Sequence, residues 1–295
     1  MSKKMIIDEV LLNAPNRRRL LKTLGIASAA ATLAGNATKL SADPAMPTPE
    51  DVVQFALNLE YLEAEFYSIA TTGKKLEERG FEIWGVGEPG NAPGPTKTRF
   101  GAINFCNHEF NTGAIALNIA ADEIAHVQVL RKALQDNGIT PIAKPALDLD
   151  ALAAKGASLH NERTFLVLSR IFEDVGESAY CAGAPFLSNS PFLRTAARIT
   201  AIEGEHVSNV RLQIARLQIP TFPVDEADVI PPPSGQNYFS TNLANGLPPF
   251  RMPGEVLFLA YGNKANVTCG GFFPNGVNGA LRTSSGPATA ANLET

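Results

Sequence analysis

The chain has 295 residues, 45% of them hydrophobic and 18% charged, which is a globular composition sufficient for one large domain or two small ones. Residues 1–42 hold seven of the 25 basic residues and two of the 29 acidic ones, so the remainder has a net charge of −9. This acidic balance argues against nucleic acid as a partner, because phosphate binding requires clustered basic residues.

The N-terminal segment has the pattern of an export signal. Asn16–Lys22 contains three consecutive arginines followed by two leucines and a lysine, and resembles a bacterial twin-arginine (Tat) signal. The apolar run Thr23–Ala34 has the length of a signal core and falls short of the ~20 residues that span a bilayer. We therefore expect residues 1–42 to direct the folded chain through the Tat export machinery to the periplasm or the exterior. The sequence leaves open whether cleavage follows Ala37 or Ala42, or whether the segment stays as a membrane anchor.

Four long segments with helical spacing of apolar residues follow. The first begins at Thr48-Pro49-Glu50-Asp51, which supplies a capping hydroxyl, a proline at the first helical position and acids in the first turn. Asn137-Gly138 ends the second segment, and prolines follow the third and fourth. The predicted helices are about 49–70, about 109–136, from 150 or 156 to 182, and 190–218.

The segments between and after these helices differ in composition. Residues 71–104 are rich in glycine and proline, so they predict a long loop between the first two helices. Residues 219–295 contain a Pro231-Pro232-Pro233 run and one apolar stretch, Val256–Tyr261. The sequence thus predicts an all-α protein: a four-helix bundle over residues 43–218 and an extended tail, residues 219–295, packed on it. We expect the last dozen residues of the tail to be disordered.

Two of the four histidines follow a glutamate by three residues, as Glu123 with His126 and Glu203 with His206. Residues i and i+3 share one helix face, so each pair offers a carboxylate and an imidazole to the same point. Both pairs interrupt apolar stripes, where charged groups are costly unless they are neutralised. A divalent metal ion would supply that neutralisation.

The other two helices each carry a glutamate with a tyrosine two turns later, Glu60 with Tyr67 and Glu173 with Tyr180. The first two helices thus repeat in the last two, as Glu and Tyr followed by the Glu-x-x-His pair. Four glutamates and two histidines are the ligand inventory of carboxylate-bridged di-iron and di-manganese bundles.

On these residues the chain resembles the ferritin-like superfamily over residues 49–218, and more closely the bacterial and plant family of ferritin-like, desiccation-related proteins. Leu59–Tyr67, Glu173–Gly176 with Ala179-Tyr180, and Gly270–Gly279 carry the closer resemblance. It implies two metal ions, iron or manganese, with Glu123 and Glu203 bridging them. The implied ligands are Glu60, Glu123, His126, Glu173, Glu203 and His206.

Further residues are expected around these ligands. Many di-iron members have an Asp before each Glu-x-x-His that holds the opposite histidine; here Asp122 precedes Glu123, but Ile202 precedes Glu203. Asp122 is therefore expected to hold His206, and the acceptor for His126 is not identified. We expect Tyr67 and Tyr180 to lie next to the ligands without binding metal, more as packed aromatic side chains than as redox participants.

Several acids compete with, or lie near, the predicted ligands. Glu63 is one turn from Glu60, and Glu177 is one turn from Glu173, so either is an alternative ligand. Glu65 and Glu205 are expected to be surface acids.

The ligand set favours redox chemistry with a small oxidant such as oxygen or peroxide, as in an oxidase, peroxidase or catalase. The alternative is a metal-free or metal-buffering scaffold that protects against stress or desiccation without turnover. A monomer or small oligomer is expected, because the loop and the tail occupy surfaces that a storage shell needs for subunit contacts.

Overall fold

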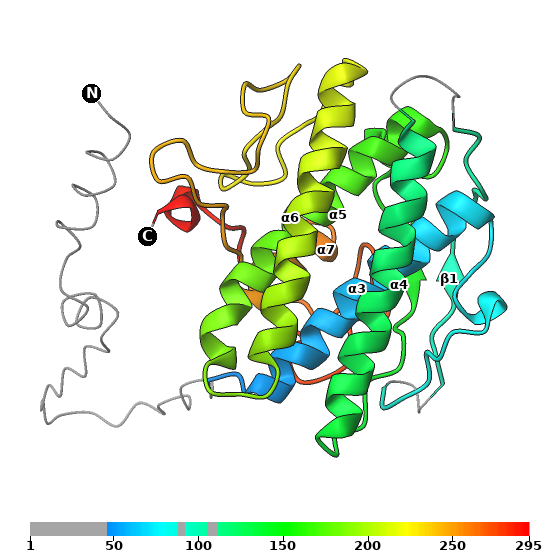
Figure 1. Cartoon of the computed structure of the whole chain (residues 1–295), viewed down its shortest axis with the longest axis vertical. Coiled ribbons are helices and arrows are strands. Elements are labelled where there is room, and N and C mark those ends of the chain that lie inside the picture. Colours follow the sequence, from blue (N-terminus) through cyan, green and yellow to red (C-terminus); the bar gives the residue numbers. More distant parts are fainter. Residues whose placement is uncertain (1–45, 88–91, 106–110, 295) are drawn as a thin grey trace, which may run out of the picture. The chain divides into compact units, whose positions relative to one another are not determined.

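The computed structural model describes residues 46–87, 92–105 and 111–294, and within them four long helices form a bundle (Figure 1). α3 packs mainly against α4, and α5 mainly against α6, while smaller contacts join α4 to α6 and α3 to α5. The all-α bundle predicted from the sequence is confirmed. The expected signal, residues 1–42, lies outside the described residues. The bundle helices are α3 (Pro49–Thr72), α4 (Thr112–Asp136), α5 (Glu162–Gly183) and α6 (Leu193–Arg216).

Local capping explains where α3 begins and ends. The Thr48 side chain accepts a hydrogen bond from the Asp51 amide at 3.2 Å, and the Asp51 carboxylate accepts one from the Thr48 amide at 2.9 Å. This reciprocal cap satisfies two amides that a helix start leaves without partners. Gly73, with a φ of 73°, ends the helix in the left-handed conformation that suits glycine.

The third helix begins later than the sequence indicated. Residues 150–161 do not form a long helix: they contain one short 3-10 turn, Ala153–Lys155, which ends at Gly156 with a φ of 79°. Asn161 then caps α5 by accepting from the Thr164 amide at 3.1 Å. The fourth helix likewise starts at Leu193 rather than at Ser190. For the second helix, Asn111 caps α4, and residues 106–110 lie outside the described part of the chain.

The long loop after α3 folds over one face of that helix. Its strand β1 (Thr96–Lys97) pairs in parallel with β2 (Leu147–Asp148), joining the loop to the segment that follows α4. Glu65 is fully buried beneath this loop, where it accepts hydrogen bonds from the Leu76 amide at 2.8 Å and from the Thr96 hydroxyl. The expectation of a surface acid at position 65 is therefore wrong, because loop residues distant in sequence cover it.

The tail packs against the bundle and contributes to its core. Helix α7 (Pro253–Ala260) buries Val256 and Leu257 in the same apolar cluster as Phe66 and Phe165 of the bundle. The expected disorder of the last dozen residues is wrong for the described part, 284–294. Within it Ala288 and Asn292 are buried, and the Asn292 side-chain amide donates to the Phe250 carbonyl at 2.9 Å.

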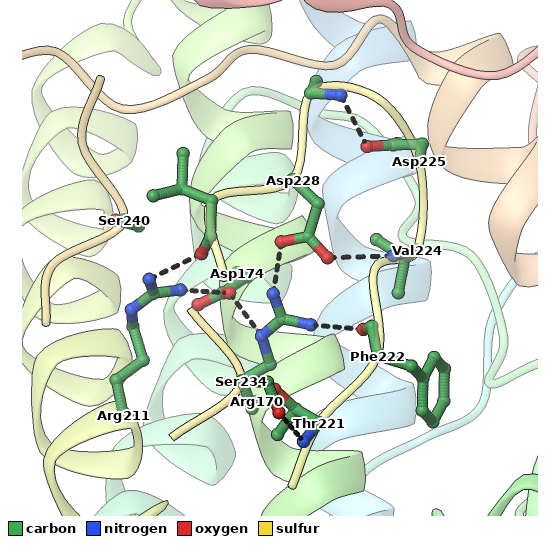
Figure 2. A network of polar contacts seen from close by, with 12 residues as sticks. Arg170, Asp174, Arg211, Thr221, Phe222, Val224, Asp225, Asp228, Ser234 and Ser240 are labelled. Carbon is green, nitrogen blue, oxygen red and sulfur yellow. Dashed lines mark hydrogen bonds and ion pairs between the residues drawn. The ribbon is translucent and has the colours of Figure 1, made fainter. Parts of the chain in front are cut away.

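Three buried arginines hold the tail to α5 and α6, and Figure 2 shows two of them, Arg170 and Arg211. Arg211 of α6 is fully buried; it donates to Asp174 of α5 at 2.7 Å and to the tail carbonyl of Val229 at 2.6 Å. Arg251 of the tail forms a bidentate ion pair with Asp225, also in the tail, at 2.6 and 2.8 Å, and donates to the Ser178 hydroxyl of α5 at 3.1 Å. These charged groups are satisfied only when the tail is in place, which fixes its path. We call this set the anchoring network; its members are Arg170, Asp174, Arg211, Asp225, Asp228 and Arg251.

Among the described residues, no helix combines the length and the apolar character needed to cross a membrane.

Candidate metal centre

All four bundle helices contribute a glutamate to one buried site, and α4 and α6 each contribute a histidine as well. The four glutamates are fully buried, and the two histidines are 7% and 4% exposed. They form two groups, in each of which one ligand atom per residue lies within 4.8 Å of the others. Glu123 and Glu203 belong to both groups, so their carboxylates lie between the two. The first group is Glu60, Glu123, His126 and Glu203, and the second is Glu123, Glu173, Glu203 and His206.

Each histidine turns its Nδ1 atom toward its own group. His126 Nδ1 lies 3.3 Å from Glu60 Oε2 and 3.3 Å from Glu203 Oε1. His206 Nδ1 lies 2.8 Å from Glu123 Oε1 and 3.4 Å from Glu173 Oε2. The two ring centroids are 6.0 Å apart. Each side of the shared pair, Glu123 and Glu203, therefore holds one imidazole and one glutamate that belongs to a single group. We call these two, Glu60 and Glu173, the single-group glutamates.

Eight ligand atoms in this centre are buried without a hydrogen-bond partner among the described residues. A buried polar atom left in this state costs free energy, and a buried charge costs more. Carboxylate oxygens and imidazole nitrogens are ligands for divalent transition metals, and a cation in each group would satisfy these atoms. The residues thus fit two metal ions. The eight atoms are Glu60 Oε2, both oxygens of Glu123 and of Glu203, Glu173 Oε2, and Nδ1 of His126 and His206.

Two buried tyrosines orient the single-group glutamates from the opposite helix. The Tyr67 hydroxyl on α3 donates to Glu173 Oε1 on α5, and the Tyr180 hydroxyl on α5 donates to Glu60 Oε1 on α3. The sequence put each tyrosine on the face of its own helix's glutamate, whereas the hydrogen bonds cross between the helices. Burial, reinforced by the neighbouring carboxylate, raises the pKa of both hydroxyls well above the usual value, so they remain donors. Each glutamate therefore keeps its other oxygen for the centre.

The outer nitrogens of the two histidines have different surroundings. Asp122 Oδ2 lies 3.2 Å from His206 Nε2, which is the contact that the sequence indicated for Asp122. No acceptor for His126 Nε2 is found within the described ranges, and Ile202, at the position matching Asp122, supplies none. A carboxylate behind a ligating histidine raises its basicity and fixes its orientation. The two halves of the centre are therefore not equivalent.

Without metal, the centre balances its charges with protons. Burial and the neighbouring Glu123 raise the pKa of Glu203 well above its usual value. For Glu123, the close approach of His126 and His206 outweighs burial and holds its pKa at about 2. For His206, burial is outweighed by Glu173 and Glu123, and the pKa is raised to about 12. Metal binding near neutral pH must therefore displace protons from these groups.

The alternative ligands Glu63 and Glu177 lie outside both groups. Glu63 adjoins the shared glutamate instead: its Oε1 lies 2.9 Å, and Glu203 Oε2 lies 3.4 Å, from the position that a Cβ on Gly176 would take. Burial, then repulsion from Glu203 and Glu123, raise the pKa of Glu63 well above its usual value. Glu177 accepts a hydrogen bond from Ser240 of the tail at 2.7 Å. Gly176 was missed from the sequence; a glycine inside a helix, one turn after Glu173, was its only signal.

A family model described as a ferritin-like domain matches residues 49–216, a range that contains all four bundle helices. No curated protein matches the chain.

Proposed function

The chain belongs to the ferritin-like domain family, and from this premise we propose that it binds two ions of iron or manganese and uses them for redox chemistry with oxygen or peroxide. The observation that carries this proposal is the pair of buried ligand groups that share Glu123 and Glu203, with inward atoms that lack partners. Iron or manganese bound by carboxylates and imidazoles supplies one-electron redox chemistry toward small oxidants. Stress protection is a role in keeping with that chemistry.

The side chains of the centre divide the work of holding two ions. Glu60 and His126 would bind the ion of the first group, and Glu173 and His206 the ion of the second. The carboxylates shared between the groups would contact both ions. Tyr67 and Tyr180 hold the single-group glutamates in place, as the hydrogen bonds across the bundle indicate. Full burial of the carboxylates excludes bulk water from the site and strengthens electrostatic interactions within it.

The test is the metal content and the turnover of the loaded protein. After loading with Fe(II) or Mn(II), we expect close to two ions per chain and consumption of oxygen or peroxide. His126→Ala and His206→Ala should each lose at least one ion and most of the turnover, because each removes the only imidazole of its group. His160→Ala, at an exposed histidine, is the matched control and should change neither quantity. Wild-type metal content in both site variants would exclude this site.

Redox chemistry is favoured over iron storage by what covers the bundle. The loop after α3 is joined to the segment following α4 by the β1–β2 pair, and the tail is anchored on α5 and α6. Bundles that assemble into a storage shell need several such faces for subunit contacts. We therefore propose a monomer or a small oligomer.

We also propose export through the Tat machinery, on the basis of the arginines in Asn16–Lys22. Replacing Arg17 and Arg18 with lysine should leave the folded protein in the cytoplasm, since the paired arginines are the feature that this route reads. Fractionation of cells that produce the two forms measures this directly. Delivery of the variant beyond the inner membrane at the wild-type level would refute the proposed route.

A further inference from the structure

An apolar cavity of about 70 Å³ lies between α3, α5, α7 and tail residues 222–224. Of its 17 lining residues only three are polar, namely Glu63, Lys155 and Asn263. None of the six proposed metal ligands lines it. It is therefore separate from the ligand groups, and its chemistry differs from theirs.

The inner end of this cavity adjoins the candidate centre. Glu63, which is 4% exposed, and the buried Gly176 both line the cavity. Glu63 Oε1 and Glu203 Oε2 converge on the side-chain position that glycine leaves open at residue 176, at 2.9 and 3.4 Å. The Glu63 carboxyl and the bare backbone of Gly176 thus separate the cavity from one of the two shared carboxylates.

The outer end reaches the protein surface. Lys155 and Asn263, at this end, are exposed, in contrast to Glu63 and Gly176. The Lys155 ammonium lies 6.0 Å from the centre of the Phe222 ring, which forms part of the wall. The cavity therefore leads from solvent, past aromatic and aliphatic side chains, to the Glu63 side of the centre.

The anchoring network fixes the tail wall of the cavity (Figure 2). Arg170 donates to the Phe222 carbonyl at 3.2 Å and pairs with Asp228, and Asp228 accepts from the Val224 amide at 2.8 Å. Both ends of the segment 222–224 are thereby tied to a buried ion pair. The wall is held by directed polar contacts, so the cavity is preformed.

The lining determines what such a cavity accepts. Protein interiors are close-packed, and a cavity walled by apolar side chains takes up small apolar molecules such as xenon. A polar molecule such as hydrogen peroxide would lose its hydrogen bonds to water there. We propose that this cavity binds dioxygen, a small apolar molecule, and is its entry route to the Glu63 side of the metal centre. This inference rests on the proposed function.

The first test needs no metal and uses xenon as the probe. Methyl NMR of the metal-free chain under xenon should shift signals of Leu62, Ile171 and Val256, which line the cavity. Ala260→Leu, which fills the cavity from α7, should abolish these shifts. Val175→Phe does the same from α5, in case the first variant unfolds. Ala56→Leu, which fills a second apolar cavity that includes no carboxylate, is the matched control and should leave these shifts unchanged.

The second test separates the oxidants in protein loaded with metal. Ala260→Leu should slow the reaction with dioxygen, leave the reaction with peroxide unchanged, and keep the wild-type metal content. Xenon shifts absent from the wild type, or an unaltered dioxygen rate in a folded variant that no longer binds xenon, would overturn the inference. If the wild type binds no metal, the proposed function is overturned instead. The xenon experiment uses the metal-free chain, so its result does not depend on metal binding.

Discussion

Glu203→Gln should strip both metal ions from the chain while leaving the fold intact. Glu203 belongs to both ligand groups, and neither of its oxygens has a hydrogen-bond partner among the described residues. Burial and the charge of Glu123 raise its pKa well above the usual value, so glutamine resembles the protonated form that the metal-free chain already tolerates. Loss of this ligand should weaken binding at both positions by more than the 10–100-fold typical of outer partners. Metal titration followed by calorimetry measures the two affinities.

The control for this variant is Glu205→Gln, two residues away on α6 at an exposed position. It makes the same replacement of glutamate by glutamine on the same helix without touching the centre, and should retain both ions. The metal-free form of Glu203→Gln should melt no lower than the metal-free wild type. Two ions bound with wild-type affinity in Glu203→Gln would show that the shared carboxylate is not a ligand.

Asp174→Ala should destabilise the fold more than any other single change in the anchoring network. Its carboxylate is 2.8 Å from Arg170 Nε and 2.7 Å from Arg211 Nη1, and both arginines are at most 1% exposed. Removing one partner of a buried ion pair leaves an uncompensated charge, at a cost of about 3–5 kcal/mol. Urea unfolding of the metal-free protein gives this free energy without a contribution from ligand binding.

Asp136→Ala provides the comparison for a surface pair. Asp136 accepts from Lys132 at 2.7 Å, but both side chains are more than half exposed, so the cost should stay below about 1 kcal/mol. If Asp174→Ala costs no more than Asp136→Ala, the network does not hold the tail. In that case the network would also not account for the fixed position of tail residues 222–224 in the cavity wall.

The parts of the fold that depend on local sequence were predictable. Thr48 and Asp51 specify the start of α3 by themselves, and the spacing of apolar residues identifies the four helices. The two Glu-x-x-His pairs are likewise local, because i and i+3 share a helix face whatever the neighbouring helices do. The structure brings these pairs together with Glu60 and Glu173.

What the sequence missed depends on contacts between segments far apart in the chain. The hydrogen bonds of Tyr67 and Tyr180 cross between α3 and α5. They depend on how these two helices are aligned along the bundle axis, which the sequence of a single helix does not determine. Glu65 is buried by a loop whose path cannot be inferred from its glycines and prolines. Arg170 and Asp174 did carry a signal: a charged i, i+4 pair amid apolar residues indicates buried partners elsewhere, although not where they lie.

Anomalous diffraction from crystals of the metal-loaded protein would establish whether two metal ions lie between the four helices. Data collected at the absorption edge of the bound metal locate each ion without assumptions about ligands. We expect two peaks in the bundle core, one beside Glu60 and His126 and one beside Glu173 and His206, both next to Glu123 and Glu203. A core without a peak, or peaks confined to surface acids, would contradict it.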